Sequence, residues 1–151
     1  MMRFTQLILL CFIVGFSVQQ TATAQEKTLL EISAQEVKKL ENPYEFRIAS
    51  FAQNEGSYGN GALILLISND TNTAVINLQG VRTELRAMQV VKTVTCVTGA
   101  TRQQVYAKGQ LRLAVKFKLR AGEEACWADG LVSIRTDKHT NRYLVKGVSG
   151  L

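Results

Sequence analysis

The stretch Leu111-Arg112-Leu113-Ala114-Val115-Lys116-Phe117-Lys118-Leu119-Arg120 alternates large apolar residues with basic residues or alanine, without a break. Successive side chains of a β-strand point to opposite faces, so a period of two places all the large apolar residues on one face. Such a pattern predicts a strand with one buried and one solvated side. The ten residues therefore indicate a β protein and orient the rest of the chain.

Shorter segments of the same character lie on both sides of this stretch, and turn-forming residues separate them. The run 62–67 is continuously apolar, which predicts a strand buried on both faces. The stretch 81–97 is long enough to bend near Ala87-Met88, and Asp129-Gly130 predicts a turn between two strands. The remaining strands are expected at 44–49, 74–78, 102–107, 125–128, 131–135 and 143–148.

The segment before Pro43 has a partly helical pattern. Ser33 and Glu36 have the spacing of a capping box, and Pro43 would end any helix that begins there. Residues 28–32 are equally compatible with a first strand. A short strand followed by a helical turn accommodates both patterns.

These elements predict an all-β fold, a small antiparallel β-sandwich of about seven to nine strands with a short N-terminal helical turn. In architecture alone the arrangement resembles an immunoglobulin-like sandwich. It departs from antibody-type domains because Trp127 directly follows Cys126, whereas the antibody-type tryptophan lies between the bridged cysteines. The resemblance implies a fold and no activity.

The N-terminus has the features of a secretory signal peptide. Arg3 supplies a positive charge, residues 7–16 are apolar, and Ala22-Thr23-Ala24 is an A-x-A cleavage site. An apolar run of about ten residues is too short to cross a bilayer, which needs about 20. We therefore expect residues 1–24 to be a cleaved signal peptide and residues 25–151 to form one β-sandwich domain, secreted or periplasmic. Removal of one basic residue would reduce the formal net charge from +6 to +5.

Cysteine usage agrees with export, because the mature chain would keep only Cys96 and Cys126. Two cysteines in an oxidising compartment most simply form one disulfide. A redox-active pair is less well supported because there is no C-x-x-C spacing. No metal site and no cofactor are expected, since His139 is the single histidine and structural zinc sites need four ligands.

The polar side of the alternating strand is basic and gives the first candidate site. Arg112, Lys116, Lys118 and Arg120 would project from one face, about 6.6–7 Å apart for every two residues. This face could bind an anionic glycan, a lipid surface or an acidic protein. The alternative is an ordinary solvated sheet face, where lysine also protects strand edges. Nucleic acid is not favoured, because no aromatic residue is interspersed with the cations.

Two aromatic residues and one asparagine are further candidates. Tyr58, in the glycine-rich loop 54–61, and Trp127, beside the disulfide, could form a recognition surface. Trp127 could instead pack over the Cys96–Cys126 bridge and fill the core. Asn69-Asp70-Thr71 matches the glycosylation sequon, although the same residues also make a good turn.

The sequence contains no catalytic arrangement of residues. His139 lies in a predicted exposed hairpin turn, and the glycine-rich segment lacks the lysine of a phosphate-binding loop. We therefore expect an exported, non-catalytic binding or structural module, acting through the basic strand face or the 54–61 loop. The alternatives are an assembly protein that pairs with a partner through an exposed strand edge and, less well supported, a small enzyme.

Overall fold

The computed structural model describes residues 29–48, 61–90 and 95–150. The predicted signal peptide and the candidate Tyr58 lie outside this part of the chain. The elements are β1 (Leu29–Leu30), α1 (Ala34–Val37), β2 (Tyr44–Ile48), β3 (Leu63–Ile67), β4 (Thr73–Leu78), β5 (Val81–Ala87), β6 (Thr101–Lys108), β7 (Leu111–Ala121), β8 (Ala125–Arg135) and β9 (Thr140–Gly150). The all-β prediction and the short strand followed by a helical turn are confirmed.

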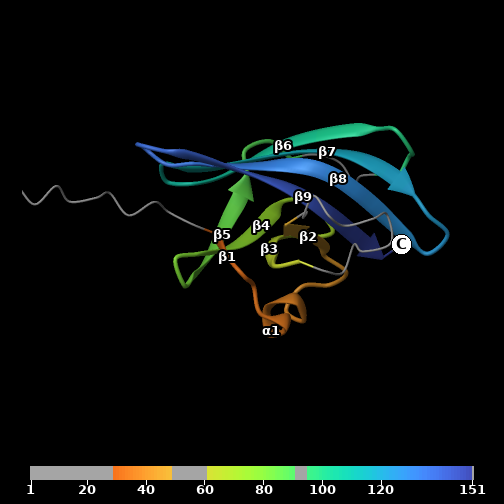
Figure 1. Cartoon of the computed structure of the whole chain (residues 1–151), viewed down its shortest axis with the longest axis horizontal. Coiled ribbons are helices and arrows are strands. Elements are labelled where there is room, and N and C mark those ends of the chain that lie inside the picture. Colours follow the sequence, from red (N-terminus) through yellow and green to blue (C-terminus); the bar gives the residue numbers. More distant parts are fainter. Residues whose placement is uncertain (1–28, 49–60, 91–94, 151) are drawn as a thin grey trace, which may run out of the picture.

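The predicted sandwich is wrong, because the sheet closes into an antiparallel barrel of eight strands. Each strand from β2 to β9 pairs with the next strand along the chain, and β9 pairs back to β2. Figure 1 shows the long strands β6–β9 on one side of the barrel and the short strands β2–β5 on the other. Inward and outward residues alternate equally in a sandwich and in a barrel, so alternation alone could not distinguish them.

A bulge explains the uninterrupted apolar run of β3. Phe46 pairs with Leu65 but Arg47 pairs with Leu63, so Ile64 is an extra residue in the ladder. The inward and outward positions shift at a bulge, and Ile64 and Leu65 both join the interior cluster. The outward Leu63 and Leu66 are buried instead beneath the N-terminal segment, in a second cluster with Ile32, Val75, Val37 and Leu40. The prediction that this strand is buried on both faces is confirmed.

Two phenylalanines fill the centre of the barrel. The rings of Phe46 and Phe117 lie 5.4 Å apart between centroids, at 53° to each other. Glycines face both of them across the sheet, with Gly147 paired to Phe46 and Gly130 paired to Phe117. An ideal Cβ at Gly130 would lie 2.7 Å from the Phe117 Cβ, so only glycine fits there. Gly130 therefore lets β8 pass the Phe117 side chain without interruption.

The predicted turn at Asp129-Gly130 is wrong, because Gly130 is the residue at which β8 passes close to Phe117. Strand β8 runs continuously from Ala125 to Arg135 and pairs residue by residue with both neighbours. Strand β5 ends at Ala87, where a bend near Ala87-Met88 was predicted, but the continuation of the β stretch to residue 97 is wrong, because residues 88–90 and 95–97 are not in a strand.

The loop between β3 and β4 is tied to β6, which lies two strands further along the sheet. The buried Tyr106 hydroxyl donates a hydrogen bond to the Thr71 carbonyl oxygen at 3.0 Å, and Gln104 Nε2 donates to the same oxygen at 2.8 Å. Within the loop, Asp70 accepts hydrogen bonds from Ser68 and Asn72, and these hold the pKa of its carboxyl below the usual range. The Thr71 carbonyl thus fixes β6 to a loop that precedes it by about 30 residues in the sequence.

The capping box predicted for α1 is not formed. Ser33 occupies the N-cap position, but its side chain makes no capping hydrogen bond. The Glu36 carboxylate forms ion pairs with Lys39 and with Arg82 of β5 instead, and the Lys39 hydrogen bond is the main cause of its lowered pKa. Glu36 thus serves to fasten α1 to the barrel.

The predicted disulfide is present and joins the segment before β6 to the start of β8. Cys96 and Cys126 have a Cα–Cα distance of 5.9 Å, and Cys126 belongs to the interior cluster.

Within residues 29–48, 61–90 and 95–150, no helix is long and apolar enough to span a membrane.

Candidate anion-binding face

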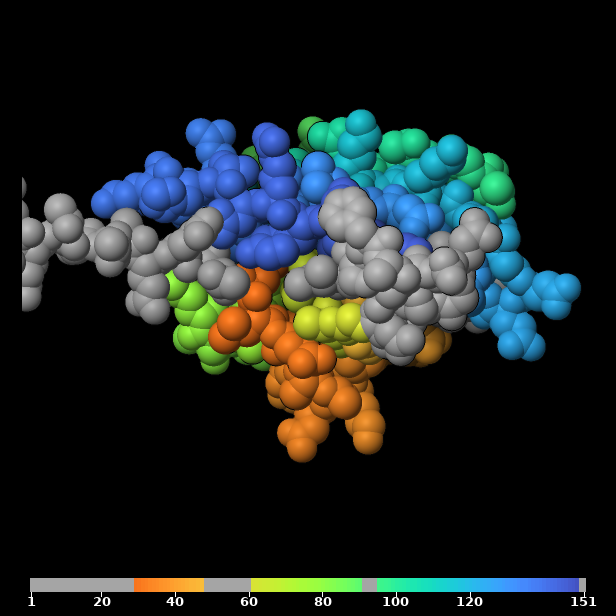
Figure 2. Space-filling model, viewed as in Figure 1, coloured from red at the N-terminus to blue at the C-terminus, as the bar shows by residue number. Residues whose placement is uncertain are grey.

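The outer surface of β7, β8 and β9 carries the most uneven charge distribution in the described structure. All eight charged residues of these strands occupy outward positions. Seven of them are basic, and we call these seven the basic face: Arg112, Lys116, Lys118, Arg120, Arg135, Arg142 and Lys146. The single acidic residue is Asp129. In Figure 2 these blue strands form the surface opposite the orange N-terminal segment.

Strand β7 places the four predicted residues as the alternation indicated. Leu113, Val115, Phe117 and Leu119 are buried inside the barrel, so the intervening residues point outward. Lys116 and Lys118 are exposed, whereas Arg112 and Arg120 are half-buried. The sequence missed Arg135, Arg142 and Lys146, because their place on the same face depends on the pairing register of β8 and β9.

An arginine pair marks one end of the basic face. Arg112 lies directly opposite Arg135 in the β7–β8 ladder, and like charges in that position repel. The Arg112 guanidinium donates to the carbonyl oxygens of Gly109 and Leu111, which hold it at the hairpin. A hollow of about 360 Å³ lies between the arginines and is also lined by Gln110, Thr136 and Asp137. An anionic group placed between the two guanidinium groups would relieve their repulsion.

Asp129 moderates the positive charge in the middle of the basic face. Asp129 lies directly opposite Lys118 in the β7–β8 ladder and directly opposite Lys146 in the β8–β9 ladder. Opposite charges in directly paired positions attract each other. Asp129 therefore lowers the positive potential in the middle of the face, and Asp137 lowers it beside the arginine pair.

The charges on the other side of the barrel are balanced and paired. Residues 29–48 and 61–90 contain six acidic and five basic side chains, whereas residues 95–150 contain four acidic and ten basic side chains. Lys39, Arg47, Arg82 and Arg86 form ion pairs with Glu36, Glu45 and Glu84. The excess positive charge of the described residues is thus concentrated in β6–β9 and their connections.

Trp127 lies on the outer surface beside the basic face and not in the interior. Its neighbours Cys126 and Ala128 are buried in the barrel core, so Trp127 points outward, directly opposite Arg120. Its indole lies beside the β7–β8 turn, where a Cβ on Gly122 would be 2.9 Å from Nε1. The interpretation of Trp127 as filler over the disulfide is therefore wrong, because consecutive strand residues face opposite ways.

Asn69 lies away from the basic face, whereas His139 lies in the turn that follows Arg135. Asn69 is exposed in the β3–β4 turn, beside the hydrogen-bonded Asp70. His139 is exposed in the β8–β9 turn, where its carbonyl oxygen accepts from the Thr136 amide. Among the side chains that the structure describes, no three of His, Cys, Asp or Glu gather as a metal site.

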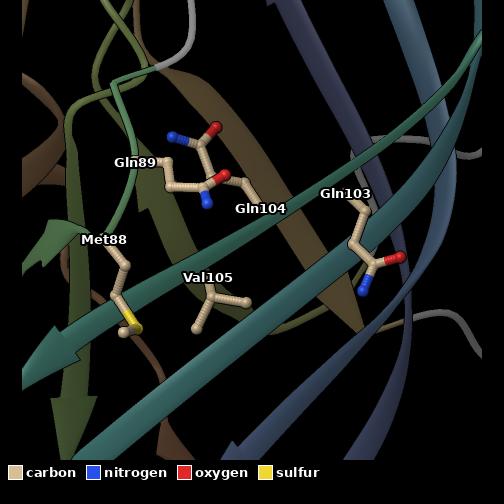
Figure 3. Close-up of a pocket in the computed structure, with 5 residues that line it drawn as sticks. All are labelled: Met88, Gln89, Gln103, Gln104 and Val105. Atoms are coloured by element: carbon tan, nitrogen blue, oxygen red, sulfur yellow. The ribbon is translucent and has the colours of Figure 1, made fainter.

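A cleft of about 420 Å³ opens where β5 and β6 separate. Their ladder ends at the hydrogen bond from the Met88 amide to the Val105 carbonyl oxygen. Figure 3 shows the five lining side chains, with the carboxamides of Gln89 and Gln104 near each other. None of these five has a group that titrates in the physiological range. The cleft therefore supplies hydrogen-bonding amides and no general acid or base.

Comparison of the chain with models of protein families, with curated proteins and with solved structures finds no match.

Proposed function

We propose that the protein is a non-catalytic binding module that recognises an acidic polymer through the basic face of β7–β9. The observation that supports this is the ratio of seven basic residues to one acidic residue on three adjacent strands. On the side of the barrel formed by residues 29–48 and 61–90, several basic side chains form ion pairs with glutamates. Clustered charge of one sign raises the local concentration and the association rate of an oppositely charged partner.

The shape of the basic face favours an extended ligand. Arg112 and Arg120 lie eight residues apart on β7, which corresponds to about 27 Å at 3.4 Å per residue. The strands are about 4.8 Å apart, so the face is about 10 Å wide from β7 to β9. A sulfated or carboxylated glycan chain, whose charges repeat along its length, matches such a surface better than a compact molecule does.

We place this binding outside the cytoplasm. The disulfide is compatible with an exported protein, because disulfides persist in oxidising compartments. The sequence features of residues 1–24 support cleavage of a signal peptide. A basic protein in such a location would be attracted to anionic surfaces and polymers.

The alternative of strand addition receives less support from the fold. The sheet closes through the β2–β9 ladder, so a partner strand could be added only where a ladder is short, as between β5 and β6. The basic face depends on no free edge. We therefore retain recognition through side chains.

Retention on a heparin column across a salt gradient tests the proposal. The wild-type protein is expected to elute above physiological salt, and the Lys116→Glu/Lys118→Glu variant is expected to elute much earlier. Counterion release makes such binding steeply dependent on salt, with a slope that falls as cationic contacts are lost.

The matched control is Lys38→Glu/Lys39→Glu, which changes the net charge equally on the opposite side of the barrel. It should elute near the wild-type protein. Equal loss of retention in both variants would mean that only net charge matters and would refute a site on β7–β9. Early elution of all three proteins would refute polyanion binding itself.

A further inference from the structure

The hollow at the arginine pair has cationic and anionic side chains in its wall. Arg112 and Arg135 lie directly opposite each other in the β7–β8 ladder, and both line the hollow together with Asp137. Directly opposed residues of an antiparallel ladder have Cβ atoms about 4.5–5.5 Å apart, so both guanidinium groups can reach one bound group. Asp137 follows Arg135 by two residues, in the turn between β8 and β9. An acidic side chain thus shares the hollow with two cations.

The Asp137 carboxylate is held by an amide and not by the arginines. With its amide nitrogen facing Asp137, Gln110 donates to both carboxylate oxygens, at 2.7 and 2.5 Å. Among the ion pairs of residues 29–48, 61–90 and 95–150, none joins Asp137 to Arg112 or to Arg135. An ionised carboxylate has about four acceptor sites, so Asp137 can accept further hydrogen bonds while Gln110 holds it. Asp137 is exposed, so a ligand can reach those sites.

The Arg112 guanidinium is restrained and still has hydrogen-bond donors for a ligand. Its Nη1 atom donates to the carbonyl oxygens of Gly109 and Leu111, at 2.5 and 3.1 Å. Its Nε and Nη2 atoms carry further N–H groups, and Arg135 is exposed beside it. The hollow therefore presents donors from two arginines on one part of its wall and a carboxylate acceptor on another.

We propose that this hollow binds one acidic sugar residue of the polymer, with its sulfate or carboxylate group between the two guanidinium groups and a neighbouring hydroxyl group donating to Asp137. The inference rests on the proposed function and specifies which class of acidic polymer the basic face takes. Planar guanidinium groups suit the oxygens of a sulfate or carboxylate, and a sugar hydroxyl is a hydrogen-bond donor. The volume of about 360 Å³ is near the lower end of the range of small-molecule sites, about 300–1,000 Å³.

Asp137 would then make the basic face selective among acidic polymers. Linear polyphosphate carries anionic groups but no hydroxyl groups along its chain, so it would meet the Asp137 carboxylate without donating to it and would be repelled. A glycan would offset the same repulsion by donating a hydroxyl hydrogen bond. Specificity commonly depends on an element of this kind, which is unfavourable to the wrong ligand.

Isothermal titration calorimetry of the protein purified after export tests the inference, with a heparin oligosaccharide and a polyphosphate of equal charge as ligands. Asp137→Ala removes one negative charge and one hydrogen-bond acceptor. We expect this variant to bind heparin about fivefold more weakly, because a hydrogen bond to a charged group is lost. The same variant should bind polyphosphate about twofold more tightly, because an exposed repulsive charge is lost.

Asp129→Ala is the matched control. It removes the same charge from the middle of the basic face, where Lys118 and Lys146 lie directly opposite the carboxylate. This variant should bind both polymers about twofold more tightly. Unchanged or tighter binding of heparin by Asp137→Ala would show that Asp137 only repels anions, and would overturn the inference while the basic face stands. A wild-type protein that binds neither polymer would instead refute the proposed function, and this inference with it.

A second measurement does not depend on binding of a long polymer. Nuclear magnetic resonance should show the backbone amide signals of Thr136 and Asp137 shifting in a saturable way with a heparin disaccharide, which carries anionic and hydroxyl groups. Sodium sulfate at equal ionic strength should shift them much less. Equal shifts with the disaccharide and with sulfate, or no shift with either, would mean that the hollow does not recognise an acidic sugar and would overturn the inference.

Discussion

Replacing Gly147 by alanine should lower the stability of the fold, because the new methyl group would collide with the Phe46 ring. An ideal Cβ at Gly147 would lie 2.6 Å from Cε1 and 2.7 Å from Cδ1 of the Phe46 ring. Carbon atoms in contact prefer about 3.5–4.0 Å, so the ring would have to retreat by about 1 Å. Phe46 is fully buried and packs on Phe117, which leaves little room for that movement. Overpacking of this kind typically costs about 1–3 kcal/mol.

Guanidinium unfolding of Gly147→Ala should therefore show a free energy of unfolding lower by about 1–3 kcal/mol with an unchanged denaturant slope. Phe46→Val removes all three ring atoms that the new methyl group would meet, and should by itself cost about 2–4 kcal/mol through the cavity it leaves. If the ring is the obstacle, the double variant should be more stable than the sum of the single effects by about 1–3 kcal/mol. A neutral Gly147→Ala, or strictly additive effects, would refute this explanation.

Four other variants or conditions test separate parts of the fold. Tyr106→Phe should lose about 1 kcal/mol in urea unfolding, because one of two hydrogen bonds to the Thr71 carbonyl disappears; an unchanged midpoint would contradict this. Burial raises the pKa of Tyr106, so the contribution of this residue to wild-type stability should be fully present below about pH 10, the unfolded value, and be lost above it. Tyr106→Phe should flatten that alkaline decline. Cys96→Ala/Cys126→Ala should lose about 3–4 kcal/mol if the bridge acts by restricting the unfolded chain, since it closes a loop of 30 residues; calorimetry should show the loss. Ile32→Ala should cost about 2–4 kcal/mol, because Ile32 is buried between the N-terminal segment and β3, and a smaller loss would mean that this segment is only loosely attached.

The strands were predictable from the sequence, but their closure into a barrel was not. The alternation of residues 111–120 identified β7 and its two faces because side-chain orientation in a strand is a local property. The pairing of β9 with β2 joins residues about 100 positions apart, and no local pattern encodes it. Gly130 shows the same limit, since its role depends on Phe117 of the neighbouring strand. Read in isolation, Asp129-Gly130 has the composition of a turn.

The residues of the candidate site could also be predicted only in part. The four basic residues of β7 could be found from their spacing, whereas Arg135, Arg142 and Lys146 joined them only through the ladder register.

The order of strands in the barrel also has a consequence for how the chain folds. Among the eight barrel strands β2–β9, every ladder except β2–β9 joins strands that follow each other in sequence, so most pairings are hairpins that can form on microsecond timescales. The β2–β9 ladder instead requires the ends of almost the whole chain to meet, and its entropic cost is recovered only when the interior closes around Phe46. This seam should therefore form last and open first. Native-state hydrogen exchange would show it as faster exchange at the amides shared by β2 and β9 than at those between β7 and β8.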